Sequence, residues 1–170
     1  MTQDSVTLRL ARLSDAKFIA AMSRDLIETG LGWSWHPERV AKSIRDRNTV
    51  TLIGADRERI VAFAIMHFGD ESAHLSLLAV RATHQRQGIG RRMVEWLLAS
   101  ARVAGIATIQ LELRTGNASA RRFYRALGFS ETAYIPGYYR GRETAMRMLR
   151  ILREPDAPVP QWQMPRLPRR

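Results

Sequence analysis

The feature that most constrains this chain is a strand-like run that passes through a glycine loop directly into an amphipathic helix. The run "LSLLAV" (75–80) is followed by "HQRQGIGRR" (84–92) and then by "MVEWLLASA" (93–101). One apolar stripe marks the helix, formed by Ile89, Met93, Val94, Leu97, Leu98 and Ala101. Such a stripe has to be buried against another layer, so the pattern predicts a sheet with helices packed on it.

Strand patterns and helical stripes alternate along the rest of the chain as well. Strands are predicted at residues 5–11, 49–55, 59–68, 73–80, 108–114 and 143–151. Only "DRE" separates the second strand from the third, which predicts a hairpin. Helices are predicted after Ser14, Pro37, the glycine loop and Asn117. The predicted order is therefore β-α-α-β-β-β-α-β-α-β, a mixed α/β domain with helices covering a central sheet.

The first and last of these helices have signals at both ends. The first is expected to have Ser14 as its N-cap, to end at Gly30 and to bury one apolar face, formed by Phe18, Ile19, Met22 and Leu26. The last is expected to begin at an Asn117 cap, to stop at Gly128 and to bury Ala120, Phe123, Tyr124 and Leu127.

Composition narrows the class of protein. The 170 residues are enough for one domain with a substantial core, assigned to residues 1–153. Residues 154–170 hold five prolines, which predicts an extended or mobile tail. The absence of cysteine excludes disulfides, cysteine-ligated zinc and a cysteine nucleophile. The chain shows no signal-peptide layout and no membrane-spanning run, so we expect a cytoplasmic protein. We also expect a protein without a metal.

The formal charge of +11 favours anionic partners. A phosphorylated cofactor, nucleic acid, the ribosome or an acidic peptide would each fit such a charge. A nucleic-acid-binding domain ranks last among these, because the chain lacks interleaved aromatic and basic strand residues and a recognition-helix pattern. Part of the charge lies in the basic end "PRLPRR".

The glycine loop has the chemistry of an anion site. Backbone N–H groups at a helix N-terminus have no partners within the helix, and the helix dipole adds roughly half a positive charge there. Gly88 and Gly90 have no Cβ, so the backbone can approach a phosphate closely, and Arg86, Arg91 and Arg92 add attraction. The loop lacks the P-loop lysine and the third glycine of a dinucleotide-binding motif. An ordinary permissive turn is the alternative.

The stretch "LSLLAVRATHQRQGIGRRMVEWLL" resembles the coenzyme A-binding motif of the GNAT family of N-acetyltransferases. Gln85, Gly88 and Gly90 match its Q/R-x-x-G-x-G/A signature. A second segment, "LELRTGNASARRFYRALGF", is similar to the family's next motif, with Asn117, Tyr124, Gly128 and Phe129 in place. The resemblance covers residues 5–152 in element order and is sharp over 74–129. It is nearest to the ribosomal-protein alanine (protein N-terminal) acetyltransferase type, through "LELR", the spacing of Asn117 and Tyr124, and "GYY".

This resemblance implies acetyl-CoA as the acyl donor. Backbone amides of the loop would hold the pyrophosphate, and the segment 78–80 would offer backbone groups to the pantetheine arm and the acetyl carbonyl. Asn117 would both cap its helix and contact the cofactor arm. The cofactor-binding set so implied is Leu78, Ala79, Val80, Gln85, Arg86, Gln87, Gly88, Ile89, Gly90, Arg91 and Asn117.

Acetyl transfer needs a neutral amine, a polarised thioester and a proton for the departing thiolate. Without cysteine, direct attack in a ternary complex is favoured over an acyl-cysteine route. The resemblance makes Tyr124 the general acid and Glu112 the base, directly or through a water. The alternatives are that the Tyr124 ring belongs to the core and that Glu112 is solvated or paired with Arg114. Glu71 and His74 are rival bases.

The acceptor is the least constrained part of the function. Trp33 and Trp35 lie in the loop between the first two helices, where packing is favoured over substrate stacking. Tyr138 and Tyr139 lie in a late loop and are better substrate candidates. A protein N-terminus is the first acceptor considered, and a small-molecule amine the second. A non-catalytic acyl-CoA-binding protein is the alternative from another class, and a homodimer stays open.

Overall fold

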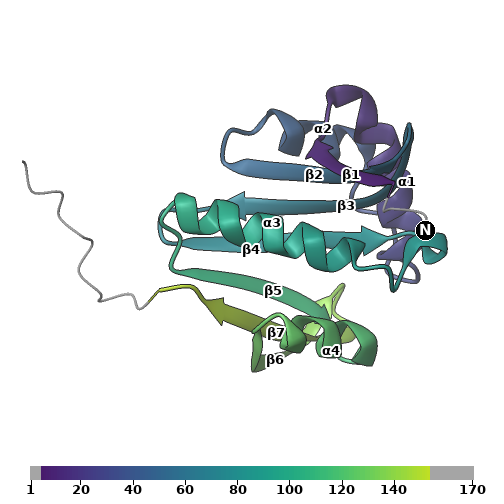
Figure 1. Ribbon diagram of the computed structural model, residues 1–170. Coiled ribbons are helices and arrows are strands. Elements are labelled where there is room, and N and C mark those ends of the chain that lie inside the picture. The colour runs from purple at the N-terminus through teal and green to yellow at the C-terminus, as the bar shows by residue number, and fades with distance from the viewer. Residues whose placement is uncertain (1–4, 154–170) are drawn as a thin grey trace, which may run out of the picture.

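The computed structural model describes residues 5–153 and contains one seven-stranded sheet between helices (Figure 1). The strands are β1 (Val6–Leu10), β2 (Thr49–Asp56), β3 (Arg59–Phe68), β4 (Ser72–Val80), β5 (Thr108–Arg114), β6 (Ser130–Tyr139) and β7 (Glu143–Ile151). The helices are α1 (Ala16–Leu26), α2 (Pro37–Arg45), α3 (Ile89–Val103) and α4 (Ala118–Ala126), with 3-10 turns at Leu13–Asp15 and Ala82–His84. The tail expected at 154–170 lies outside the described residues.

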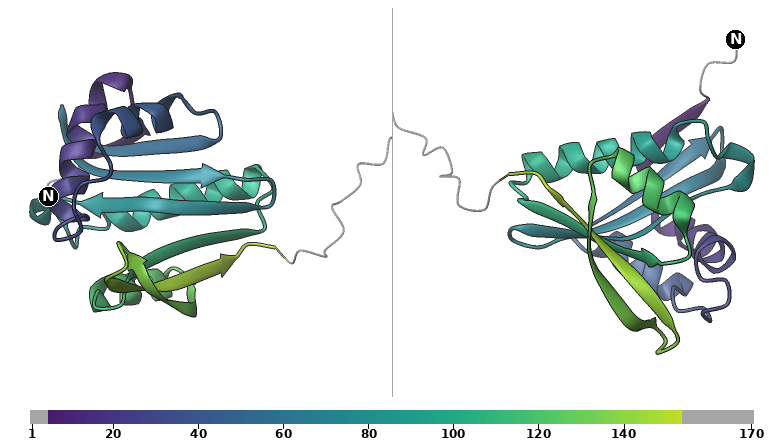
Figure 2. Two further views of the ribbon diagram at one scale, coloured as in Figure 1. Left: turned by 180° about the vertical axis from the view of Figure 1, so that it is seen from behind. Right: turned by 90° about the horizontal axis from the view of Figure 1, so that it is seen from below.

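The sheet has the strand order β1-β2-β3-β4-β5-β7-β6. Only β4 and β5 are parallel neighbours, because α3 carries the chain back between them; every other pair is antiparallel. α3 and α4 cover one face of the sheet, and α1 and α2 cover the other (Figure 2). None of the helices in residues 5–153 is long and apolar enough to cross a membrane.

The central strand β3 shows why the sequence folds into three layers. Its run "IVAFAIM" is buried along its whole length. Phe63 and Ile65 pack into the cluster beneath α1 and α2, whereas Ala64 and Met66 pack into the cluster beneath α3 and α4. A strand covered on both faces needs apolar side chains at every position, which explains the loss of alternation.

One strand of the sheet was not predicted from the sequence. Residues 130–139, which were given no strand and whose end was placed in a late loop, form β6, which pairs with β7 at the sheet edge. Most of its side chains are exposed, and Pro136 and Gly137 interrupt the strand pattern. A proline is tolerated on an edge strand because no neighbour needs its missing N–H. The true order is therefore β-α-α-β-β-β-α-β-α-β-β.

The start of the first helix also differs from the prediction. Ser14 lies within the 3-10 turn and does not cap α1; instead the Asp15 carboxylate accepts the Arg12 backbone N–H at 2.7 Å and pairs with Arg9 at 2.8 Å. Phe18 is exposed, as is Leu26. The buried face of α1 consists mainly of small residues and is formed by Ala16, Ile19, Ala20, Met22 and Ser23.

Candidate active site

The candidate site lies where β4 and β5 separate. The two strands pair only at Ser72–Thr108, Ala73–Ile109 and His74–Gln110, and then diverge (Figure 1). A bulge accompanies the separation: Leu75 and Leu77 oppose consecutive residues of β3, so Ser76 is the extra residue on β4. Beyond His74, the edge of β4 that faces β5 has no neighbouring strand, which leaves the backbone of 78–80 open to another partner on that side.

The loop after β4 ends on Gly88, the N-cap of α3. Gly88 has a φ of 80°, and a Cβ placed on it would meet no atom within 4 Å. Its requirement for glycine is therefore conformational rather than spatial. A Cβ on Gly90 would make ordinary van der Waals contact with the Phe123 ring on α4, at 3.4 Å. The helix start thus has the conformation expected of an anion site.

The other loop residues divide between structural and exposed roles. The Gln85 side chain donates to the Val80 carbonyl at 2.9 Å, and the Ile89 side chain is buried in the core. Arg92, expected to attract a polyanion, instead donates to the Val6 carbonyl at 3.1 Å. Arg91 is exposed and paired with Glu95. These contacts fix the loop to β4 and leave its backbone amides, rather than its side chains, as the principal donors.

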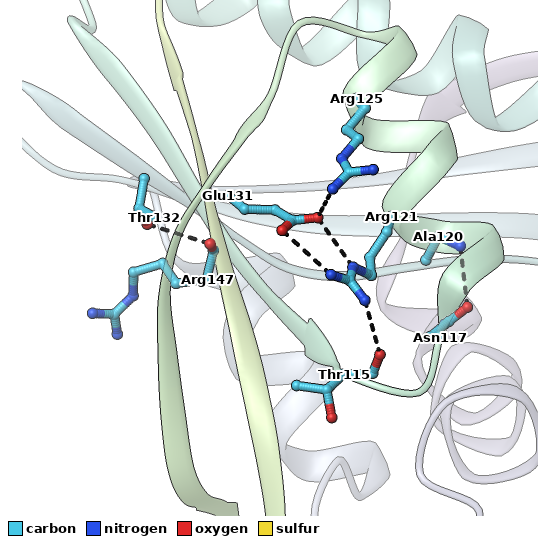
Figure 3. A network of polar contacts seen from close by, with 8 residues as sticks. All are labelled: Thr115, Asn117, Ala120, Arg121, Arg125, Glu131, Thr132 and Arg147. Carbon is cyan, nitrogen blue, oxygen red and sulfur yellow. Dashed lines mark hydrogen bonds and ion pairs between the residues drawn. The ribbon is translucent and has the colours of Figure 1, made fainter.

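Helix α4 is anchored at its beginning and along its outer face (Figure 3). The Asn117 side chain accepts the Ala120 N–H at 3.1 Å, which confirms the predicted cap. Arg121 and Arg125 both bind the Glu131 carboxylate on β6, Arg121 at 3.1 Å. This network joins α4 to the edge of the sheet and holds the residues on the inner face of the helix in position over the sheet.

Tyr124 lies on that inner face and is 8% exposed. Its ring packs edge-to-face against Phe123 and Phe129, with centroids 5.0 and 5.5 Å away. Burial raises the pKa of the Tyr124 phenol well above its ordinary value, so the hydroxyl stays protonated at neutral pH. The ring belongs to the core, as one interpretation expected, and the phenol keeps the proton that a general acid needs.

Glu112 is the centre of a polar cluster on the opposite face of β5. Its side chain is only 4% exposed, and both carboxylate oxygens are engaged. Oε2 lies 2.5 Å from His74 Nε2, and Oε1 accepts Arg147 Nε and Gln110 Nε2, each at 3.0 Å. Burial raises the pKa of Glu112, but the hydrogen bonds and charges of His74 and Arg147 outweigh it, so the net pKa is lowered.

The alternative that paired Glu112 with Arg114 is wrong. Arg114 does not pair with it but lies near Glu143, at 3.5 Å, and donates to the Thr29 carbonyl at 2.6 Å. Arg147 is the true partner, because the register of β5 against β7 sets it directly opposite Glu112. Of the two rival bases, His74 belongs to this cluster, whereas Glu71 lies exposed on the turn before β4, near Arg153.

The two loop tryptophans pack against the protein. Trp33 donates to the Ala20 carbonyl at 3.2 Å, and the Arg39 guanidinium lies 3.9 Å from the Trp35 ring. Both rings border the cluster beneath α1 and α2, which agrees with packing. The loop itself is held by Glu28, a buried carboxylate that accepts the backbone N–H groups of Ser34 at 2.8 Å and Trp35 at 3.3 Å.

The two tyrosines of "GYY" lie at the end of β6, beside the polar cluster around Glu112, rather than in a loop. Their rings meet edge-to-face at 5.0 Å. Burial raises the pKa of Tyr138, and the negative charge of Glu112 raises it further. Tyr139 lies 6.0 Å from the Arg114 guanidinium. No group of three or more histidine, aspartate or glutamate side chains within residues 5–153 is arranged to hold a metal.

Comparison with protein families agrees with this geometry. The model of the acetyltransferase (GNAT) family matches residues 19–129, which include the glycine loop, Glu112, Asn117 and Tyr124. The chain belongs to the GNAT family. The resemblance of the two motifs is thereby confirmed, and so is the mixed α/β fold that it implied.

Individual relatives support the same placement. The ribosomal protein bS18-alanine N-acetyltransferase of Escherichia coli strain K12 is 40% identical over 93 residues, which are 53% of this chain and 63% of that protein. The crystal structure of the ribosomal-protein-S18-alanine N-acetyltransferase from Escherichia coli has a TM-score of 0.76 at 28% identity, over 88% of this chain and 95% of that one. Ard1 from Thermoplasma volcanium has a TM-score of 0.76 at 25% identity, over 88% and 99%.

Three functional candidates of this GNAT domain escaped the sequence analysis: Ser76, Arg147 and Glu28. Arg147 lies in a predicted strand, and a buried carboxylate on a neighbouring strand needs a basic partner. This pairing could therefore have been predicted once the strand order was known. Ser76 and Glu28 had none, because a bulge and a loop-binding carboxylate depend on contacts that no short motif encodes.

The buried pairing predicts a pH-dependent stability difference. Replacing Glu112 by glutamine should lower the free energy of unfolding at pH 7 by about 1–3 kcal/mol, since His74 and Arg147 lose a charged partner. The folded protein holds the pKa of Glu112 below its ordinary value of about 4.3, so the contribution is present above that pH and is lost as the pH falls through the folded-state pKa.

Urea unfolding at pH 3 to 8, followed by tryptophan fluorescence, measures this difference. Wild type and E112Q should differ most near pH 7, and the difference should shrink as the pH falls below the ordinary glutamate pKa of about 4.3. A constant difference over the whole range would contradict the buried ion pairing.

Proposed function

We propose that this GNAT domain is an N-acetyltransferase that moves the acetyl group of acetyl-CoA to a primary amine by direct attack in a ternary complex. The observation that carries the proposal is the helix start at Gly88 directly beside the part of β4 that has no β5 partner. The helix start can bind phosphate, and the unpaired edge of β4 beside it can bind amides. Together they suit a long ligand that has a pyrophosphate at one end and an amide-rich arm.

The donor would be held mostly by backbone. Amides at 87–90 would bind the pyrophosphate, and the backbone of 78–80 would bind the pantetheine amides as a strand would. Gln85 supports this arrangement by fixing the loop to Val80, and the exposed Arg86 and Arg91 would supply attraction. Asn117, engaged as a cap, still has an amide nitrogen to offer the arm.

The chemistry then requires one acid and one base. The neutral amine attacks the acetyl carbonyl carbon, the N–C bond forms, and the C–S bond breaks to release the thiolate. Tyr124 would donate its phenolic proton to that sulfur and regain one from the nitrogen of the intermediate through solvent. The base would be the Glu112–His74 pair, which lies on the face of the sheet opposite Tyr124.

The acceptor we propose is the N-terminal α-amine of a protein. Its pKa of about 7.7–8.0 lies well below the 10.4 of a lysine, so less assistance from a base is needed. The names of the relatives, which are N-acetyltransferases of a ribosomal-protein alanine, point to the same class of acceptor. We also assign the protein to the cytoplasm, where acetyl-CoA and nascent chains occur.

Acetyl-CoA binding should depend on the conformation of Gly88. Gly88→Glu should abolish binding measured by calorimetry, because a side chain strains the positive φ and a carboxylate repels the pyrophosphate. The matched control is Gly105→Glu, at the other end of α3, where φ is +78° and a Cβ also meets nothing within 4 Å. Equal loss in both variants would indicate misfolding rather than a donor site at the loop.

Turnover should depend on the Tyr124 hydroxyl. Tyr124→Phe should lower kcat by about 10²- to 10⁴-fold, since the thiolate would leave without a proton, and should leave acetyl-CoA affinity unchanged. Tyr134→Phe removes the same hydroxyl from an exposed position on β6 and should turn over like wild type. Unchanged kcat in Tyr124→Phe would assign the ring to core packing alone.

The acceptor class can be tested by thiol release from acetyl-CoA. A peptide that begins with alanine should support release, and the same peptide with a blocked N-terminus and no lysine should not. Release with small amines alone would redirect the acceptor to a metabolite. Release with neither, in a protein that binds acetyl-CoA, would indicate a non-catalytic acyl-CoA-binding domain.

A further inference from the structure

The two side chains of the Glu112–His74 pair differ in their exposure to solvent. The Glu112 carboxylate is nearly inaccessible and already accepts three donors, whereas the His74 side chain is 38% exposed. A proton added to Glu112 would weaken the hydrogen bond and ion pair with Arg147. A proton added to His74 would instead turn its 2.5 Å hydrogen bond to Glu112 into an ion pair. The geometry therefore favours the imidazole as the site of protonation.

The carboxylate also sets the tautomer of the imidazole. Because Glu112 accepts from Nε2–H, the neutral ring carries its lone pair on Nδ1. Nδ1 lies 3.3 Å from the hydroxyl of Ser76, the bulge residue of β4. Ser76 in turn lies two residues before the open backbone at 78–80. The basic nitrogen thus faces the stretch where the acetyl group would be held.

Groups from every neighbouring strand surround His74. His67 on β3 and Gln110 on β5 are its direct strand partners, and Glu112 is the charged group in contact. Arg147 on β7 reaches it through Glu112, and Tyr138 on β6 lies near the same carboxylate. A cavity of about 190 Å³, lined in part by His67, His74 and Gln110, gives water access to the ring.

We propose that His74 Nδ1 takes the proton from the acceptor ammonium, directly or through the Ser76 hydroxyl, and that Glu112 is its positioning carboxylate. The proposal rests on the acetyltransferase function argued above. The ammonium gives one proton to Nδ1, and the nitrogen lone pair so freed forms the N–C bond as the C–S bond breaks. The imidazolium, paired with Glu112, then returns its proton to water in the adjoining cavity.

The test is the pH dependence of kcat/KM with acetyl-CoA and an alanine-initiated peptide between pH 5 and 9. His74→Gln should lower kcat/KM about 10²-fold at pH 7 and remove the acidic limb that belongs to the base. Glu112→Gln should keep an acidic limb but move it to lower pH, because the imidazolium loses its counter-charge.

Two further measurements keep the inference falsifiable. Imidazole in the buffer should restore part of the activity of His74→Ala, which a purely structural role for His74 does not predict. Nitrogen-15 NMR of the wild-type protein should show the Nε2–H tautomer of His74 at high pH, independently of turnover. An Nδ1–H tautomer, or an acidic limb that survives His74→Gln but vanishes in Glu112→Gln, would overturn the proposal. Failure of the wild type to bind acetyl-CoA would instead refute the proposed function.

Discussion

The early end of the parallel pairing between β4 and β5 is the constraint on which the rest of the site depends. After three residue pairs the strands separate, although each continues for several residues against its other neighbour. The separation opens the β5-facing edge of β4 along the end of the strand, from which the chain leads through Gly88 into α3. A longer ladder would satisfy those backbone groups internally and leave the helix start with no strand edge in line with it.

Strand alternation then divides the chemistry between two faces. On β5, Ile109, Leu111 and Leu113 point into the core beneath α3 and α4, the same cluster that holds Tyr124, and the alternate positions place Glu112 on the opposite face with His74. The proposed acid for the leaving sulfur and the proposed base for the attacking amine would therefore be held on opposite sides of one sheet. In this proposal, donor and acceptor would approach from different faces without competing for space.

How far the sequence predicts this site depends on the range of the contacts involved. The glycine loop, the α3 stripe and the Asn117 cap are all determined within a few residues, and each was predicted correctly. β6 was missed because an exposed edge strand containing Pro136 and Gly137 lacks the alternation that burial imposes. The alternative pairing of Glu112 with Arg114 is wrong because the true partner, Arg147, is distant in the sequence and is set opposite Glu112 only by the register of β5 against β7.

The same contrast separates the donor half of the site from the acceptor half. The donor would be bound by backbone groups of one continuous stretch, which a motif can describe completely. The proposed acceptor face would be made by contacts between distant segments, such as Arg114 with Thr29 and His74 with Glu112, and by Glu28, which holds the loop that carries both tryptophans. Each of those contacts can change without altering the glycine loop, so a chain can keep its acyl donor while its acceptor changes.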